Sequence, residues 1–312
     1  MRKRFSSLLV CAGVVVCSLA ACGSDDPSNL DPSSSATSAA AFPVTIETPD
    51  GRVTIEEQPS AIVSLSPTAT EMLFAIGADD QVEAVDDQSD FPAGVPTTDL
   101  SGYEPNIEAI VSYAPDLVVL ANDIGGVVKG LGKLGVPVLL QPAAATIDDT
   151  YAQIEQLGTV TGHAEEATTT IAQMRKEVEQ IVASAPDGGG MAVYHELDDT
   201  YYSVTSDTFI GQVYSMFGVE NIADEAKGAG SGYPQLSSEY IVDRDPSLIV
   251  LADGECCGQS PATVAARPGW GNLTAVTDGS VIEVDDAVAS RWGPRVVDFM
   301  RAVAEGLQGS TA

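Results

Sequence analysis

The sequence predicts an α/β protein with two lobes of similar build joined by one long helix. Three observations support this fold class. Short apolar runs of strand length alternate with segments of helical periodicity along most of the chain. One segment of the first half recurs in the second half, and a long amphipathic helix is predicted between the two copies. Such alternation is typical of parallel or mixed sheets that are covered by helices.

The first residues are typical of an export signal. Arg2, Lys3 and Arg4 precede a short apolar run at 7–16. Basic residues followed by an apolar run and then small residues mark a secretory signal, and this run is shorter than the roughly 20 residues of a membrane span. We therefore predict a signal peptide over 1–21.

The segment that follows is predicted to be a flexible tether, because it is rich in Ser, Ala, Asp and Pro and has no apolar period. Such a composition cannot bury enough surface to fold, and its average reach is roughly 25 Å. The sequence thus divides into five parts: a signal peptide over 1–21, a tether over 22–42, an N-terminal α/β lobe over 43–163, an interlobe helix over 164–186 and a C-terminal α/β lobe over 187–312.

Seven apolar runs are predicted to be buried strands: 61–65, 82–85, 117–120 and 136–140 in the first lobe, and 191–194, 248–251 and 281–284 in the second. Residues 44–55 are expected to form a hairpin that turns at Pro49-Asp50-Gly51 and leads into the first lobe.

The repeat aligns residues 106–121 with residues 237–252, and half of the aligned positions are identical. Each copy predicts a helix capped by Asn106 or Ser237, a break at a proline and then a buried strand. Between the copies, apolar residues form one stripe on a helix, namely Ala167, Ile171, Met174, Val178, Ile181 and Val182. Two similar lobes and a stiff connecting helix are the predicted result.

Charge and residue usage exclude several functions. The formal net charge of −31 opposes nucleic-acid binding. The chain has two histidines and neither a Gly-x-Ser-x-Gly nor a Gly-Lys-Ser/Thr motif, so we expect no enzyme, no bare-metal site and no cofactor. Cys256 and Cys257 are adjacent in a chain predicted to be exported, where disulfides persist. They form either a vicinal disulfide or a pair of thiols on a tight loop.

Several motifs resemble those of the solute-binding proteins that serve importers of iron–siderophore complexes, haem and vitamin B12. They lie at 62–77, 90–92, 106–110, 114–118 and 134–138 in the first half, and at 234–239, 267–270 and 294–295 in the second. The resemblance covers nearly all of the predicted folded region. In addition, Leu19-Ala20-Ala21-Cys22 resembles the bacterial lipobox. This implies that Cys22 carries lipid and that the chain is anchored on the extracytoplasmic face of the cell membrane, with no other membrane contact.

The family resemblance implies two Rossmann-like lobes with a ligand in the cleft between them. It also implies delivery of that ligand by a monomer to an ABC permease dimer with its ATPase. Glu108 and Glu239 match the two glutamates with which the family docks on the permease. The alternative role for each is to complement a helix dipole, which contributes less than about 1 kcal/mol.

The resemblance leaves the ligand open among bulky metal chelates. We expect an iron–siderophore complex, with a corrinoid such as vitamin B12 or haem as alternatives. Because loops after parallel strands line such clefts, the predicted ligand contacts are Asp87, Gln88, Tyr103 and Asn122 in the first lobe and Tyr194, His195, Tyr233, Arg291 and Trp292 in the second. Arg291 is expected to offer its guanidinium to carboxylate or catecholate oxygens.

Overall fold

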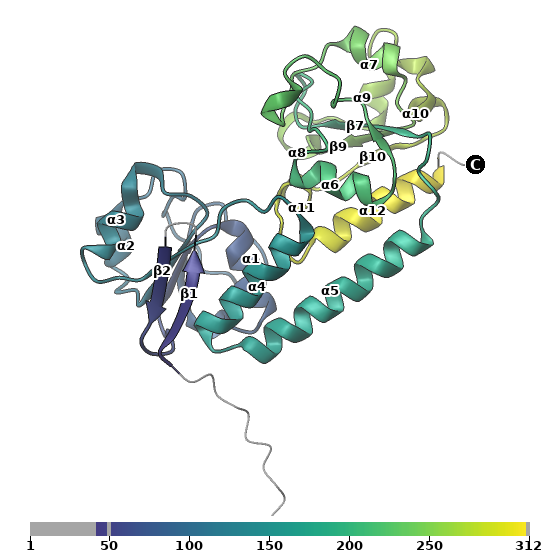
Figure 1. The fold of residues 1–312 in the computed structure, drawn as a ribbon. Coiled ribbons are helices and arrows are strands. Elements are labelled where there is room, and N and C mark those ends of the chain that lie inside the picture. The colour runs from purple at the N-terminus through teal and green to yellow at the C-terminus, as the bar shows by residue number, and fades with distance from the viewer. Residues whose placement is uncertain (1–41, 49–50, 310–312) are drawn as a thin grey trace, which may run out of the picture. The chain divides into compact units, whose positions relative to one another are not determined.

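A computed structural model describes residues 42–48 and 51–309. The predicted signal peptide, Cys22 and the tether up to residue 41 lie outside the described residues. Within the described residues, no helix combines the length and apolar character needed to cross a membrane. The folded body, from residue 42 onward, contains both predicted lobes (Figure 1).

The N-terminal lobe is built on a four-stranded parallel sheet with the order β4-β3-β5-β6. Its strands are β3 (Ile62–Leu65), β4 (Val82–Val85), β5 (Leu117–Leu120) and β6 (Val138–Leu140). The helices of this lobe are α1 (Pro67–Ala75), η1 (Asp79–Gln81), α2 (Ile107–Val111), η2 (Ile124–Gly126) and α3 (Val127–Gly132). The expected hairpin is present as the antiparallel pair β1 (Val44–Thr48) and β2 (Gly51–Ile55).

The C-terminal lobe repeats this plan with a second parallel sheet in the order β10-β9-β7-β8. Its strands are β7 (Ala192–Glu196), β8 (Glu220–Asn221), β9 (Leu248–Leu251) and β10 (Val281–Glu283). Its helices are α6 (Phe209–Met216), η3 (Ala229–Ser231), α7 (Ser238–Arg244), α8 (Gly254–Cys257), α9 (Pro261–Ala265), η4 (Trp270–Asn272), α10 (Thr274–Thr277), α11 (Asp286–Ser290) and α12 (Val296–Gly309). When the strands of each sheet are numbered by their order in the chain, both sheets have the spatial order second, first, third, fourth. This confirms two α/β lobes of similar build.

The sequence repeat coincides with the third strand of each sheet and the helix before it. Asn106 caps α2 by accepting a hydrogen bond from the backbone of Ala109, and Ser237 caps α7 by accepting one from Tyr240. The repeated helix is followed by β5 in one lobe and by β9 in the other. Equivalent residues of the two copies therefore occupy equivalent places in the two lobes.

One long helix, preceded by a helix that packs on the first lobe, connects the two lobes. α4 (Ile147–Thr161) ends at Gly162, which adopts a left-handed conformation with φ of 81° and turns the chain into α5 (Ala164–Ser184). In Figure 1, α5 runs beside both α4 and α12, and it packs against each of them. The predicted interlobe helix is thus present.

The core has three parts because each sheet is covered on both faces. Neighbouring residues of a strand point to opposite faces, so Leu117 and Val119 join one cluster while Val118 and Leu120 join another. α2 and α3 cover the outer face of the first sheet, and α7, α9 and α10 cover that of the second.

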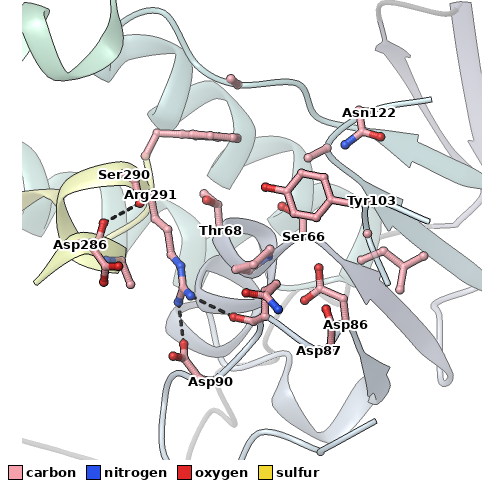
Figure 2. A pocket seen from close by; sticks show the side chains of 18 of the residues that line it. Ser66, Thr68, Asp86, Asp87, Asp90, Tyr103, Asn122, Asp286, Ser290 and Arg291 are labelled. Carbon is pink, nitrogen blue, oxygen red and sulfur yellow. Dashed lines mark hydrogen bonds and ion pairs between the residues drawn. The ribbon is translucent and has the colours of Figure 1, made fainter. Parts of the chain in front are cut away.

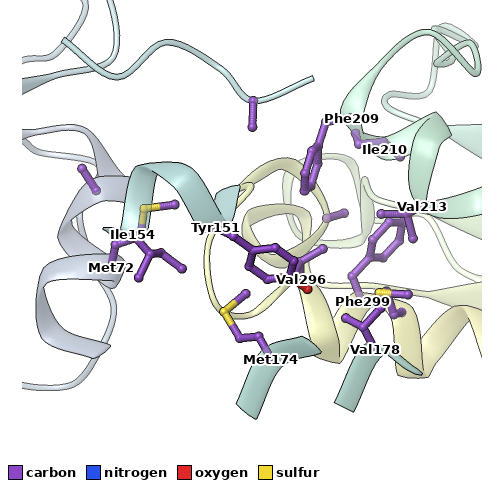
Figure 3. Packing of buried hydrophobic residues seen from close by; sticks show 14 of the residues in the cluster. Met72, Tyr151, Ile154, Met174, Val178, Phe209, Ile210, Val213, Val296 and Phe299 are labelled. Carbon is purple, nitrogen blue, oxygen red and sulfur yellow. The ribbon is translucent and has the colours of Figure 1, made fainter. Parts of the chain in front are cut away.

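The inner faces of both sheets share one continuous apolar cluster. Figure 3 shows its centre, in which side chains from α1, α4, α5, α6 and α12 meet. Met174 and Val178 lie on the apolar stripe of α5 and are 4% and 6% exposed. The connecting helix is therefore packed along its length into the interior that both lobes share.

Candidate ligand-binding pocket between the lobes

A cavity lies where the two lobes meet and has a volume of about 690 Å³, within the range of small-molecule sites. Figure 2 shows it from close by. The first lobe contributes the ends of β3, β4 and β5 and the loops that follow them. The second lobe contributes Glu255 of α8 and the segment from Asp286 to Trp292.

The first lobe forms its side of the pocket from the carboxyl ends of three parallel strands. Ser66 follows β3, Asp86 and Asp87 follow β4, and Asn122 follows β5. In parallel α/β sheets the ligand crevice lies outside this edge, next to the strand from which the order reverses, and here that strand is β3. The prediction that loops after the strands line the cleft thus fits the geometry of this lobe.

Tyr103 presents an exposed aromatic ring at the pocket. Its side chain is 71% exposed, unusually high for a tyrosine, and the ring lies between Asn122 and Asp86 in Figure 2. The preceding residue, Gly102, passes so close to β3 that an added Cβ would lie 2.8 Å from Asp86 Oδ2 and 2.9 Å from the Leu65 carbonyl oxygen. A glycine is therefore needed to bring Tyr103 to this place.

Asp86 is the buried acid of the first lobe's side, with 3% of its surface exposed. Its Oδ1 accepts a hydrogen bond of 2.7 Å from Ser89. Burial raises the pKa of Asp86, and the neighbouring charge of Asp87 raises it further. Asp86 thus forms the floor beside Tyr103 while Asp87 and Gln88 are exposed at the rim.

Arg291 lines the pocket, where a ligand contact was predicted, but its terminal nitrogens are already engaged by the first lobe. Its terminal nitrogens donate to Glu71 Oε1 at 3.0 Å, to Asp90 Oδ1 at 2.8 Å and to the Gln88 carbonyl oxygen at 2.9 Å. All three acceptors belong to the first lobe. The guanidinium is therefore used to join the lobes.

Arg295 completes this junction. It donates to both oxygens of Glu71, whose side chain is 2% exposed, and its guanidinium lies 4.2 Å from the centre of the Phe91 ring. Burial alone would raise the pKa of Asp90, but its hydrogen bond to Arg291 and the charge of that residue outweigh burial and lower it. We call the contact of residues 291–295 with α1 and residues 88–91 the interlobe seam.

Trp292 is held at the same place by α4. Its indole nitrogen donates to Gln153 Oε1 at 2.9 Å, and its carbonyl oxygen accepts from Thr150 at 2.9 Å. The residue is half-buried and still lines the pocket, as predicted. Trp292 therefore belongs both to the pocket wall and to the interlobe packing.

Tyr194 and His195, which were predicted to contact the ligand, are both fully buried and are not among the residues that line this cavity. β7 runs to Glu196, so these side chains lie within a central strand, between helices on either face. Tyr194 donates to Glu196 Oε2 at 3.0 Å, and His195 Nδ1 lies 2.6 Å from the Tyr214 hydroxyl. Burial lowers the pKa of His195 to about 3, so the ring is neutral at physiological pH.

The remaining predicted residues lie away from the pocket lining or at its rim. Tyr233 is 51% exposed and does not line the cavity. Glu108 and Glu239 are exposed in the first turns of α2 and α7, one on each lobe. Cys256 and Cys257 are joined by a disulfide in α8, directly after the pocket residue Glu255. The disulfide alternative is thus the one that the structure contains.

Two residues of the seam, Glu71 and Asp90, were not identified from sequence. Glu71 is the one charged residue of α1, whose other residues are apolar, Thr or Pro. A lone carboxylate in an apolar helix requires a buried cationic partner, which is a usable signal. Its partners Arg291 and Arg295 lie 220 and 224 residues away, however, and no local sequence pattern predicts which arginines they are.

Comparison with known proteins now decides the family. Residues 62–288 match the family model described as periplasmic binding protein. This chain belongs to the periplasmic binding protein family. The match covers more than half of the chain and confirms the resemblance that its motifs predicted.

Similar proteins extend the match over the whole length. A Halobacterium salinarum protein named cobalamin-binding protein is 32% identical, covering 99% of this chain and 86% of that protein. A Bacillus subtilis protein named as an ABC transporter substrate-binding lipoprotein is 29% identical, covering 100% and 99%. This family and these relatives are binding proteins, so the chain has a solute-binding role.

Solved structures support the fold. The periplasmic vitamin B12 binding protein of Vibrio cholerae matches with a TM-score of 0.68 at 22% identity, covering 81% of this chain and 98% of that one. The periplasmic haem-binding protein of Roseiflexus sp. RS-1 matches with a TM-score of 0.69 at 20% identity, covering 81% and 99%. At these identities the likeness establishes the two-lobed α/β architecture.

Proposed function

We propose that this protein is the lipid-anchored, extracytoplasmic solute-binding component of an ABC importer and that its ligand is a corrinoid. The observation that carries the proposal is the pocket of about 690 Å³ between the lobes, with the exposed ring of Tyr103 at its side. Support for the corrinoid comes from the relatives named cobalamin-binding and vitamin B12-binding proteins. This choice differs from the iron–siderophore complex that we expected from the sequence, which nothing above tests.

The lining of the pocket is compatible with a corrinoid and offers haem a single candidate for an axial ligand. Haem carried by a protein takes an axial ligand such as His, Met, Cys or Tyr. Among the described residues that line the cavity, only Tyr103 is of these types. A corrin macrocycle already holds its cobalt and needs no axial ligand from the protein. An aromatic ring and polar side chains are sufficient to bind it.

Delivery is proposed to use the two symmetric glutamates. Glu108 and Glu239 stand at equivalent places of the sequence repeat, exposed and one on each lobe. A permease dimer with one Arg-lined socket per subunit fits such a pair. Acylation of Cys22, which lies outside the described residues, would hold the protein at the membrane near that partner.

Titration of the purified mature protein with cobalamin, cobinamide, ferric siderophores and haem tests the ligand. Trp292 lines the pocket, so a bound absorbing ligand is expected to quench its fluorescence, and calorimetry gives the affinity. We expect the corrinoids to bind most tightly. Tyr103→Ala should weaken that binding by about tenfold or more, as loss of an aromatic contact does. Tyr233→Ala, the matched control outside the pocket, should leave it unchanged. Tighter binding of a siderophore or haem would refute the corrinoid assignment.

A further inference from the structure

The pocket is lined by acids from both lobes. Among the described residues that line it, five carry a carboxyl group and one carries a guanidinium. The acids are Asp86, Asp87 and Asp90 of the first lobe and Glu255 and Asp286 of the second. Figure 2 shows Asp86 and Asp87 near Tyr103, and Asp90 and Asp286 near Arg291. The cavity is therefore surrounded by negative charge on opposite sides.

The positive groups at the pocket do not balance these acids. The guanidinium of Arg291 contacts the carboxylates of Glu71 and Asp90 at 3.0 and 2.8 Å, so its charge is offset at the seam. The N-terminus of α1 begins at Pro67 in the lining and contributes about half a positive charge. Among the described residues, Asp87, Glu255 and Asp286 have no ion pair with a cationic side chain, so acidic groups are in excess around the cavity.

Several of these carboxylates have unused acceptor capacity. Among the described residues, no group donates a hydrogen bond to the side chain of Asp87 or Glu255, and both residues are exposed. Within the part of the chain that the structure describes, the carboxylate of Asp286 accepts a hydrogen bond from one group, the backbone nitrogen of Ala287, at 2.8 Å from Oδ1. A carboxylate accepts through two oxygens with about four lone-pair sites. The pocket thus offers charged acceptors on both walls.

We propose that the pocket selects its ligand by charge: it takes a neutral or cationic corrinoid whose rim carries primary amides, and it discriminates against anionic chelates. This inference rests on the proposed function and adds the rule by which the site chooses. An amide N–H that donates to a carboxylate forms a charge-assisted hydrogen bond. A ligand carboxylate or catecholate at the same place meets a like charge and gains no hydrogen bond. Asp87 and Glu255 are the specificity-determining residues.

The test compares two pairs of ligands by calorimetry on the purified mature protein. One pair is a corrinoid with all of its side-chain amides intact and the same corrinoid with one amide hydrolysed to a carboxylate. The other is a neutral or cationic ferric hydroxamate and an anionic ferric catecholate. In each pair that binds at all, we expect the first ligand to bind about tenfold or more tightly than the second. This is the size of effect that one like-charge contact has in a partly exposed site. A cationic ligand should also bind less tightly as salt increases.

The variant Asp87→Asn with Glu255→Gln should reduce that preference to about threefold or less. The control Asp80→Asn removes one exposed acid at the other end of β4, away from the pocket, and should leave the preference intact. Equal affinities within a pair, or the same preference in the double variant, would overturn the charge rule. If the corrinoids fail to bind and the ferric hydroxamate binds, the corrinoid assignment is refuted. The comparison of the two ferric complexes then still tests whether the pocket selects by charge. Binding of none of the four refutes both.

Discussion

Arg295 donates two hydrogen bonds to Glu71 across the seam between the lobes, from Nε to Oε2 at 3.0 Å and from a terminal nitrogen to Oε1 at 2.6 Å. Arg291 donates to the same carboxylate at 3.0 Å. One acid of α1 thus binds two arginines that lie on either side of Trp292, between α11 and α12. This fork-to-fork geometry fixes the angle between partners as well as their distance.

Loss of the Glu71 carboxylate should strongly destabilise the fold. We expect Glu71→Ala to lower the free energy of unfolding by about 3 kcal/mol, because it leaves two partly buried guanidinium groups without their shared partner. The control is Glu47→Ala, which removes an ion pair with Arg52 whose side chains are 72% and 75% exposed. Such a pair contributes less than about 1 kcal/mol. Denaturant unfolding of both variants measures the contrast, and equal losses would contradict the structural role of Glu71.

His195 should make stability depend on pH. Burial lowers its pKa from 6.5 to about 3, so between these values the unfolded chain binds a proton that the folded chain does not. The free energy of unfolding should therefore fall as pH falls below 6.5, by about 1.4 kcal/mol per pH unit. Comparison with His195→Gln isolates this contribution. The stability of the wild-type protein relative to His195→Gln should fall by roughly 2 to 3 kcal/mol between pH 7 and pH 4.5, and a constant difference would disprove it.

The disulfide at the pocket rim can be checked chemically. Cys256 and Cys257 are bonded to each other, so the peptide that contains them should resist alkylation in the native protein. After reduction it should take up two alkyl groups. Mass spectrometry of the digested protein distinguishes the two states without interference from Cys22. Labelling of both thiols before reduction would show that they are free.

Replacement of the two glutamates that we propose as docking sites should affect transport and leave binding unchanged. Glu108→Ala combined with Glu239→Ala removes one exposed acid from each lobe, away from the pocket lining. We expect unchanged ligand affinity by calorimetry and a loss of uptake of about tenfold in cells that depend on the importer. Reversal of one charge, Glu108→Lys, should have a larger effect because it repels a cationic partner. Normal uptake by the double variant would rule out the proposed docking sites.

The fold was predictable to the extent that its signals are local. The runs 82–85, 117–120 and 248–251 coincide with strands because each consists mainly of buried apolar residues. The strand predicted at 191–194 ended too early, because β7 continues to Glu196. His195 and Glu196 are polar, and their burial depends on distant partners such as Tyr214 and Arg267. β8 was missed because two residues, Glu220 and Asn221, carry no period.

The pocket was predictable on one side. In the first lobe Asp87 and Asn122 follow the ends of β4 and β5 directly and could be found by counting from the strands, whereas Tyr103 lies far along the loop that follows β4, shortly before α2. In the second lobe the equivalent loop residues are buried or turned away, and the wall is formed instead by Glu255 and by the segment that approaches the first lobe. Which loops of the second lobe reach the cleft depends on how the two lobes pack together, and a linear sequence does not contain that information.

The shared apolar interior has a kinetic consequence. Residues of α1, α4, α5, α6 and α12 form one continuous apolar cluster, so the lobes cannot slide past each other without separating these buried side chains. A site fixed in this way exists before the ligand arrives, and little binding energy is spent on rearranging it. Capture should then be a single encounter whose observed rate grows in proportion to ligand concentration without reaching a plateau.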